Sequence, residues 1–138
     1  MRRQLEGGFD LDDDPARIDV DAVHRFLSEE SYWARQRSRE TNERLVREAA
    51  RVVGLYRGER QIGFARAVTD GVTIAYLADV YVLEEFRGRG LGAELVREMI
   101  DRGPFAAQTW YLRTDDPDFY RRLGFGPPSQ QLLERPPR

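Results

Sequence analysis

The sequence predicts an α/β protein in which helices cover both faces of one mixed β-sheet. Residues 52–82 hold three segments rich in β-branched and aromatic residues, separated by two turn sequences, which is the pattern of an antiparallel meander. A glycine-rich turn, a helical pattern and a further strand pattern follow, and a crossover of this length normally makes its two strands parallel. The chain of 138 residues has the length of one domain, so we expect a single domain over residues 1–138.

The first fifty residues predict one strand and two helices. A strand is expected over Gln4–Leu11, although two consecutive glycines weaken it. The first helix follows the N-cap Asp19 and the second follows the N-cap Ser38, and both helices carry apolar residues at helical spacing. Ser31–Arg37 lies between them and is expected to be a loop.

The meander and the crossover unit come next. The meander strands are expected at Val52–Tyr56, Gln61–Val68 and Val72–Val82. The helix after the glycine-rich turn should run to about Arg102, because its leucines and methionine recur at spacings of four and Gly103-Pro104 then stops it. Gln108–Arg113 is predicted as the strand parallel to the third meander strand.

The C-terminal end predicts a short helix and little else. Asp116 is a suitable N-cap, and Pro117 is suited to a first helical turn. Beyond Gly126 the tail is rich in proline, which leaves room for at most a short strand around Gln130–Leu133.

The composition excludes several classes of site. Without cysteine the chain has no disulfide framework, thiolate zinc site or cysteine nucleophile. A lone histidine, His24, supports neither a histidine metal cluster nor a Ser-His-Asp triad, so we expect no metal. All the cationic side chains are arginine, so no side-chain amine exists that could form a Schiff base.

The charge balance and the hydropathy narrow the expected partners. The 22 basic residues are matched by 24 acidic ones, for a net charge of -2, and a nucleic-acid-binding domain should instead carry a basic excess. No apolar run is long enough to cross a membrane, and no signal-peptide core follows the first residues. We therefore expect a cytoplasmic protein that binds neither nucleic acid nor a membrane.

The most informative segment is the glycine turn, defined as Arg87-Gly88-Arg89-Gly90-Leu91-Gly92. It joins the third meander strand to the next helix, whose first amides are unpaired and carry partial positive charge. Its glycines allow the backbone to approach a bulky anion closely, and its two arginines add cations. The turn therefore predicts a pyrophosphate site, with a plain tight turn as the alternative. Neither a Rossmann fingerprint nor a Walker loop fits the segment.

Two motifs resemble the GNAT family of N-acetyltransferases. Arg87, Gly90 and Gly92 match that family's Gln/Arg-x-x-Gly-x-Gly/Ala signature, and Leu77–Glu85 is similar to the strand that precedes it. Phe119–Phe125 is similar to the Tyr-x-x-x-Gly-Phe sequence of the family's last helix. The resemblance covers roughly Arg51 to Phe125 well.

The resemblance implies a GNAT-like fold and a function. The expected reaction is transfer of the acetyl group of acetyl-CoA to an amine of a small molecule or protein, by direct attack in a ternary complex without a metal. A homodimer is among the assemblies that the resemblance implies. A module of the same fold that binds acyl-CoA without catalysis, as a sensor, is the alternative function.

The resemblance also implies where the coenzyme lies. The amides of Arg89 to Gly92 would hold the pyrophosphate, next to Arg87 and Gly88. The backbone of Val80, Tyr81 and Val82 would pair with the pantetheine arm, which requires the parallel strands near Val80 and Trp110 to splay apart. An amide near Val80 would polarise the thioester carbonyl.

Catalytic and acceptor residues are expected around this cleft. Tyr120 stands where the family often keeps its general acid, the alternative being that it belongs to one apolar face of a short helix. Asp79 is the expected general base, since burial would raise its pKa; equally, it could cap a bulge or pair with an arginine. Tyr32 and Trp33 are expected to wall the acceptor pocket or to pack in the core, with Tyr81 lining the same cleft.

Overall fold

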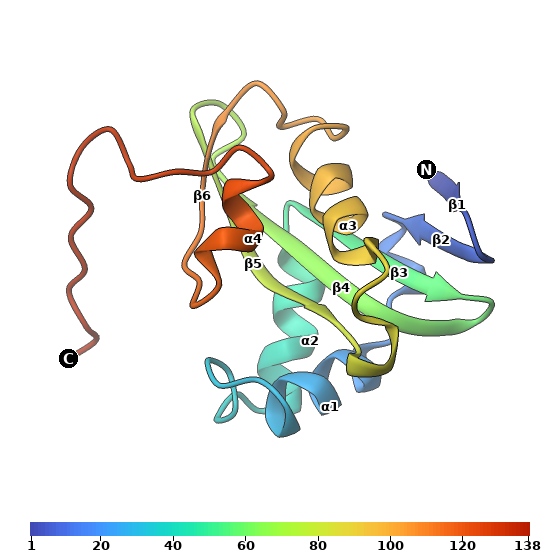
Figure 1. Cartoon of the computed structure of the whole chain (residues 1–138). Coiled ribbons are helices and arrows are strands. Elements are labelled where there is room, and N and C mark those ends of the chain that lie inside the picture. Colours follow the sequence, from blue (N-terminus) through green and yellow to red (C-terminus); the bar gives the residue numbers. More distant parts are fainter.

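The computed structural model describes residues 1–138 and contains one six-stranded sheet, in the order β1-β2-β3-β4-β5-β6 (Figure 1). Every neighbouring pair is antiparallel except β5 and β6, which are parallel. The predicted meander and the predicted switch to parallel pairing are therefore confirmed. The strands are β1 (Arg2–Leu5), β2 (Phe9–Asp12), β3 (Arg51–Arg57), β4 (Arg60–Thr69), β5 (Ile74–Val82) and β6 (Thr109–Tyr111).

Four α-helices cover the two faces of the sheet, with α1 and α2 on one face and α3 and α4 on the other (Figure 1). All three predicted N-caps are confirmed, because the side chains of Asp19, Ser38 and Asp116 accept a hydrogen bond from the backbone amide three residues later. No helix is long and apolar enough to cross a membrane. The helices are α1 (Val20–Glu29), α2 (Arg39–Glu48), α3 (Leu91–Ile100) and α4 (Pro117–Arg121).

The prediction of one strand over Gln4–Leu11 is wrong, because β1 and β2 form a hairpin there. Gly7 and Gly8 both have a positive φ, which turns the chain back after Leu5. The strand predicted over Gln108–Arg113 is shorter than expected and keeps only β6. No strand forms around Gln130–Leu133, and the tail extends away from the sheet in Figure 1.

Two apolar cores lie on opposite faces of the sheet. The larger has 15 buried residues and packs α3 against the sheet, with Leu95, Val96 and Met99 fully buried. The smaller has 9 buried residues and packs α1 and α2 against the other face. Helices therefore hold the sheet from both sides. The β5–β6 edge is less regular than the rest of the sheet.

Two irregularities of β5 shape that edge. Asp79 and Val80 of β5 lie opposite the single residue Ala65 of β4, which makes a β-bulge. The parallel pairing of β5 with β6 covers three residue pairs and ends at Tyr76, whereas β5 continues to Val82. The predicted parting of the parallel strands is therefore confirmed near Val80 but is wrong at Trp110, which still pairs with Ala75.

A buried ion cluster fastens α3 to the other end of the sheet. Glu98 of α3 is 1% exposed and accepts hydrogen bonds from Arg3 of β1, at 2.6 Å, and Arg51 of β3, at 3.2 Å. The Arg51 side chain is only 8% exposed. A buried carboxylate is tolerated when such partners satisfy it, and removal of one partner leaves an uncompensated charge.

We predict that Glu98→Gln lowers the free energy of unfolding by about 2 kcal/mol, because the buried guanidinium of Arg51 then keeps only Asp13 as a counter-charge and Arg3 loses its carboxylate partner. Urea unfolding followed by circular dichroism measures this change. Glu94→Gln on the same helix is the matched control: its ion pairs with Arg97 and Arg102 are partly exposed, so the loss should stay below about 1 kcal/mol. Equal losses in the two variants would contradict the prediction.

Candidate functional site

The glycine turn begins beyond β5 and ends at the start of α3. Gly88 and Gly90 both have φ +78, in the left-handed region, and Gly90 is the N-cap of α3. The first helical hydrogen bond runs from the amide of Glu94 to the carbonyl of Gly90, at 3.2 Å, and no backbone amide from Gly88 to Ala93 has an acceptor within the chain. A row of unpaired amides therefore lies at the positive end of a ten-residue helix.

The donors of the glycine turn fit a pyrophosphate. A Cβ built on Gly88 or Gly90 would meet no atom within 4 Å, so both residues border open space and the turn is accessible to a bulky anion. The two arginines differ: Arg87 donates through Nε to the carbonyl of Val82, at 2.9 Å, and so fastens the turn to the end of β5. Arg89 is exposed over the ring of Phe86 and supplies the freer cation.

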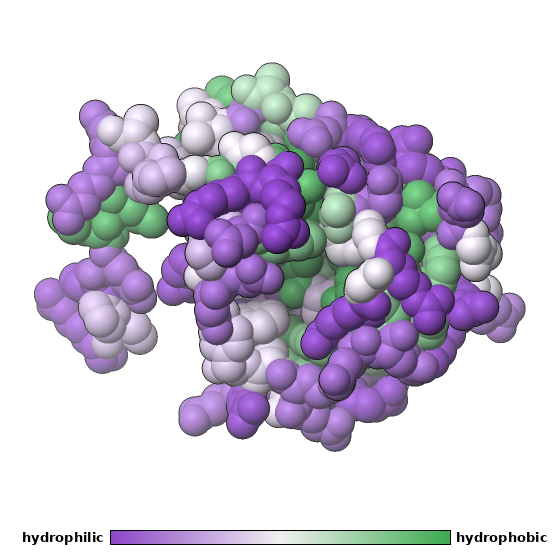
Figure 2. Space-filling model, viewed as in Figure 1, coloured by the Kyte–Doolittle hydropathy of each residue, from purple (hydrophilic) through white to green (hydrophobic).

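An apolar hollow adjoins the glycine turn. Figure 2 shows apolar atoms at the bottom of a hollow between α4 and the start of α3. A Cβ on Gly92 would lie 3.4 Å from the ring of Phe119 and 3.8 Å from Val82, at ordinary contact distance, so the start of α3 lies against both α4 and the end of β5. Val80 is half-buried at the β5 bulge, in the part of the strand that β6 leaves unpaired.

Asp79 lies at the bulge with φ +54 and is the only non-glycine residue with a positive φ. Its side chain is 3% exposed. One carboxylate oxygen accepts hydrogen bonds from Arg66 Nε, at 2.6 Å, and Arg37 Nη1, at 2.8 Å; the other accepts from Trp33 Nε1, at 2.8 Å. These three donors hold a conformation that costs about 1–2 kcal/mol for a residue with a Cβ.

The expectation that burial raises the pKa of Asp79 is wrong. Burial does push this pKa upward, but the charge and hydrogen bonds of Arg66, with those of Arg37 and Trp33, outweigh it and hold the pKa below its ordinary value. A carboxylate with so little affinity for a proton is a poor general base. Asp79 instead lies at a β-bulge and pairs with an arginine, and these are the two alternatives that the sequence left open.

Tyr120 lies on α4, where it is partly buried against the larger core. Its ring meets Phe119 and Phe125 edge to face, with centroids 4.9 Å and 5.8 Å away. Burial, with a smaller contribution from Asp116, raises the pKa of Tyr120 to about 12. The phenol is therefore protonated at neutral pH and able to donate a proton or a hydrogen bond.

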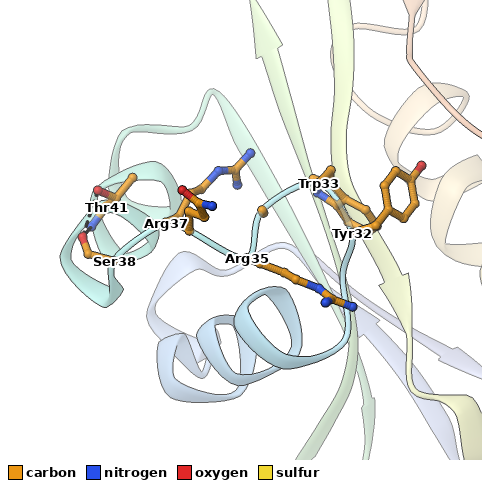
Figure 3. Close-up of a pocket in the computed structure, with 8 residues that line it drawn as sticks. Tyr32, Trp33, Arg35, Arg37, Ser38 and Thr41 are labelled. Atoms are coloured by element: carbon orange, nitrogen blue, oxygen red, sulfur yellow. Dashed lines mark hydrogen bonds between the residues drawn. The ribbon is translucent and has the colours of Figure 1, made fainter.

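The α1–α2 loop carries the predicted acceptor residues, and Figure 3 shows Tyr32 directed towards α4 and Trp33 beside β5. Tyr32 is 62% exposed and donates a hydrogen bond to Asp115, in the loop before α4. Trp33 is 41% exposed and bonds Asp79, so neither aromatic is a core residue. The buried Ser31 fixes the loop by donating through Oγ to the carbonyl of Leu27, at 2.6 Å.

The prediction that Tyr81 lines the same cleft as Tyr32 and Trp33 is wrong for its side chain. Tyr81 is 5% exposed and stacks on Phe26 of α1 with a centroid distance of 3.9 Å. Residues after the bulge reverse the faces they present, so Tyr81 enters the smaller core. Its backbone remains part of the unpaired stretch of β5.

Sequence reasoning missed three participants in this region: Arg66, Arg37 and Asp115. Arg66 offers a signal, because it interrupts a β4 sequence that is otherwise apolar and a buried arginine requires a carboxylate. Arg37 and Asp115 lie in loops rich in charged residues, where no spacing rule distinguishes them.

Comparison with known proteins agrees with this geometry. A model of the acetyltransferase (GNAT) family matches residues 20–125. The chain belongs to the GNAT family. A protein of Gibberella zeae named "putative acetyltransferase" is 30% identical, over 79% of this chain and 73% of that protein.

Solved structures agree on the GNAT fold. A Xanthomonas campestris pv. campestris crystal structure, described as a "putative acetyltransferase" of the GNAT family, has a TM-score of 0.85 and 33% identity, and 92% of each chain is covered. A Deinococcus radiodurans structure described as a "putative acetyltransferase" has a TM-score of 0.74 at 24% identity, over 98% of this chain and 94% of that chain, and shows the fold alone. The family match includes the α1–α2 loop, the bulge, the glycine turn and α4 of this GNAT protein.

We predict that Asp79→Asn destabilises the protein by about 3 kcal/mol near neutral pH, because Arg66 loses its counter-charge while asparagine still tolerates the positive φ. The folded-state pKa of Asp79 is depressed, so its contribution is complete above the ordinary value of 3.8 and is lost as the pH falls through the folded value. The difference between wild type and variant should therefore shrink in acid.

Urea unfolding at a series of pH values measures this difference. Asp118→Asn is the control, because its ion pair with Arg121 is exposed and should contribute less than about 1 kcal/mol. A difference that stayed constant down to the lowest pH would show that the Asp79 carboxylate does not provide the stabilisation.

Proposed function

We propose that this protein is an acetyl-CoA-dependent N-acetyltransferase that transfers the acetyl group directly to an amine of a small molecule or protein in a ternary complex. The observation that carries the proposal is the row of unpaired amides from Gly88 to Ala93, beside a stretch of β5 that has no strand on its open side. Membership of the GNAT family supports the same chemistry.

In this proposal the coenzyme has two contact regions. The amides of Arg89 to Gly92 bind the pyrophosphate, with Arg89 as the nearby cation. The backbone of Val80 to Val82 pairs with the pantetheine arm as an added strand would. Acetyl-CoA supplies the activated thioester, and an amide near Val80 at the bulge polarises its carbonyl, a type of contact worth about 3 kcal/mol in transition-state stabilisation.

In this proposal Tyr120 assists the departure of the leaving group, the thiolate of CoA. Its pKa of about 12 lies above that of a thiol, roughly 8.5, so complete proton transfer from the phenol is uphill. The phenol therefore acts chiefly by donating a hydrogen bond to the sulfur as negative charge develops there. With neither cysteine nor lysine in the chain, the usual carriers of a covalent acetyl group are absent, which favours direct transfer.

No protein base is needed to prepare the amine. The Asp79 carboxylate is occupied by Arg66, Arg37 and Trp33, and its pKa is held low. We assign Asp79 the function of fixing the bulge and the α1–α2 loop. Solvent removes the proton from the amine.

We predict that saturating acetyl-CoA, at about a hundred times Kd, stabilises the wild type by roughly 2.7 kcal/mol in thermal unfolding, and that Gly90→Val abolishes this gain. Valine is strained at φ +78, so the backbone at the start of α3 must shift and the row of amides loses its arrangement. Gly58→Val is the matched control: Gly58 has φ +61 with no atom near its Cβ, but lies in the β3–β4 turn.

Both glycine variants should lose similar intrinsic stability, because both place valine in the left-handed region. Only Gly90→Val should lose the response to the coenzyme. If acetyl-CoA did not stabilise the wild type, or if it stabilised Gly90→Val and Gly58→Val equally, the pyrophosphate site at the glycine turn would be ruled out.

We predict that Tyr120→Phe leaves the acetyl-CoA thermal response intact and lowers turnover by about 10²-fold, the lower end of the range for acid–base assistance, because the raised pKa weakens the acid. Release of free CoA thiol measures turnover. Tyr111→Phe on β6 is the control, since that hydroxyl makes no hydrogen bond within the chain. Unchanged turnover would remove Tyr120 from the mechanism. Binding without turnover in the wild type would favour the sensor function.

A further inference from the structure

An open cavity of about 730 Å³ lies between the α1–α2 loop and the first turn of α2 (Figure 3). Its walls include two aromatic, two guanidinium and two hydroxyl side chains, and no acidic side chain. These residues are Tyr32, Trp33, Arg35, Arg37, Ser38 and Thr41. The lining therefore favours a ligand that carries negative charge.

The charge of the cavity wall is positive after neighbouring ion pairs are counted. Arg37 contacts Asp79, but Asp79 also neutralises Arg66, so these three groups together carry one net positive charge. Arg35 has no ion pair and adds a second, while Asp115, which accepts a hydrogen bond from Tyr32, places one negative charge beside the wall and leaves its net charge positive. The whole chain has a net charge of -2, so this positive wall is a local feature and not an average property of the surface.

Both arginines are held in place by one atom while their remaining donors stay available. Arg35 donates through Nε to the carbonyl of Ser31, at 2.6 Å, and its terminal nitrogens have no partner in the chain. Arg37 donates through Nη1 to Asp79, at 2.8 Å, and leaves Nε and Nη2 unused. The two side chains point away from each other in Figure 3, so each guanidinium group offers its free donors to a carboxylate or phosphoryl group separately.

The cavity adjoins the reaction centre proposed above. Trp33 and Arg37 line it and also bond Asp79, the neighbour of Val80 at the bulge. A ligand anion on the arginines would therefore be separated from the bulge by one layer of side chains. Positive charge so close to the acceptor also disfavours an ammonium ion and favours the neutral amine, which is the form that attacks a thioester.

Resting on the proposed N-acetyltransferase function, we infer that the acceptor is a small primary amine bearing an anionic group, a carboxylate or a phosphoryl group, which the positive charge of both arginines attracts and Arg35, the arginine without an ion pair, binds. Trp33 and Tyr32, whose rings meet edge to face at 5.0 Å, flank the body of the ligand. An acceptor that is only cationic would meet repulsion from the same wall.

Binding of matched amine pairs to protein saturated with CoA tests this inference without any turnover. Calorimetry would compare α-amino acids with their amides, and phosphoethanolamine with ethanolamine. We expect the member of at least one pair that carries the anionic group to bind about tenfold or more tightly than the member that lacks it. The pair with the larger ratio distinguishes carboxylate from phosphoryl recognition. Equal binding within both pairs, or no binding by any anionic member, would overturn the inference.

Arg35→Gln should remove most of this preference, and Arg35→Glu should reverse it. Both changes fall on an exposed loop side chain, so folding should be retained. Arg44→Gln is the matched control, because it removes one arginine charge from the middle of α2, outside the cavity lining, where the side chain is 71% exposed. A preference that survived Arg35→Glu would also overturn the inference.

The acetyl-CoA thermal response, measured on the same preparations, separates the two proposals. An intact response with no preference for anionic amines leaves the acetyltransferase function standing and rejects the anionic acceptor. A lost response with a retained preference in the coenzyme-free protein rejects the coenzyme site and keeps the anion site.

Discussion

One residue in a left-handed conformation sets the geometry on which the candidate site depends. β5 pairs with β4 along its length, yet it must part from β6 after Tyr76 and present its backbone to an open cleft. The bulge at Asp79 makes this change of direction. Its positive φ is unfavourable for aspartate, and the contacts with Arg66, Arg37 and Trp33 hold it in place. The same contacts attach the α1–α2 loop to the sheet, so backbone geometry and the acceptor side of the site are fixed together.

This arrangement is one instance of a pattern that runs through the molecule. Each of three buried carboxylates is bonded by two arginines from different segments of the chain. A guanidinium group has five donors in a rigid plane, so one side chain can hold a carboxylate and still bond a second group. The sequence has no lysine, and arginine performs all of these cross-links. The pairs are Arg2 and Arg17 on Asp10, Arg37 and Arg66 on Asp79, and Arg3 and Arg51 on Glu98.

Local signals in the sequence were reliable where the interaction itself is local. The N-caps Asp19, Ser38 and Asp116 were predictable because a cap bonds an amide three residues away. The glycine turn was predictable because positive φ values at a helix start leave a recognisable spacing. The β1–β2 hairpin was missed because two glycines weaken a strand and also close a turn, and only pairing with β3 distinguishes the two outcomes.

The sequence by itself determined the order of elements from α1 to α4, the switch to parallel pairing and the glycine turn, since each depends on residues close together in the chain. Only the tertiary structure decided the ionisation of Asp79, the burial of Tyr81 and the positive wall around Arg35 and Arg37. Each of these depends on charges or faces brought together from distant segments: Arg66 lies 13 residues from Asp79 and Arg37 lies 42 residues away. The pKa of a buried carboxyl group and the face on which residues after a bulge lie both depend on such neighbours, and no spacing along the chain encodes them.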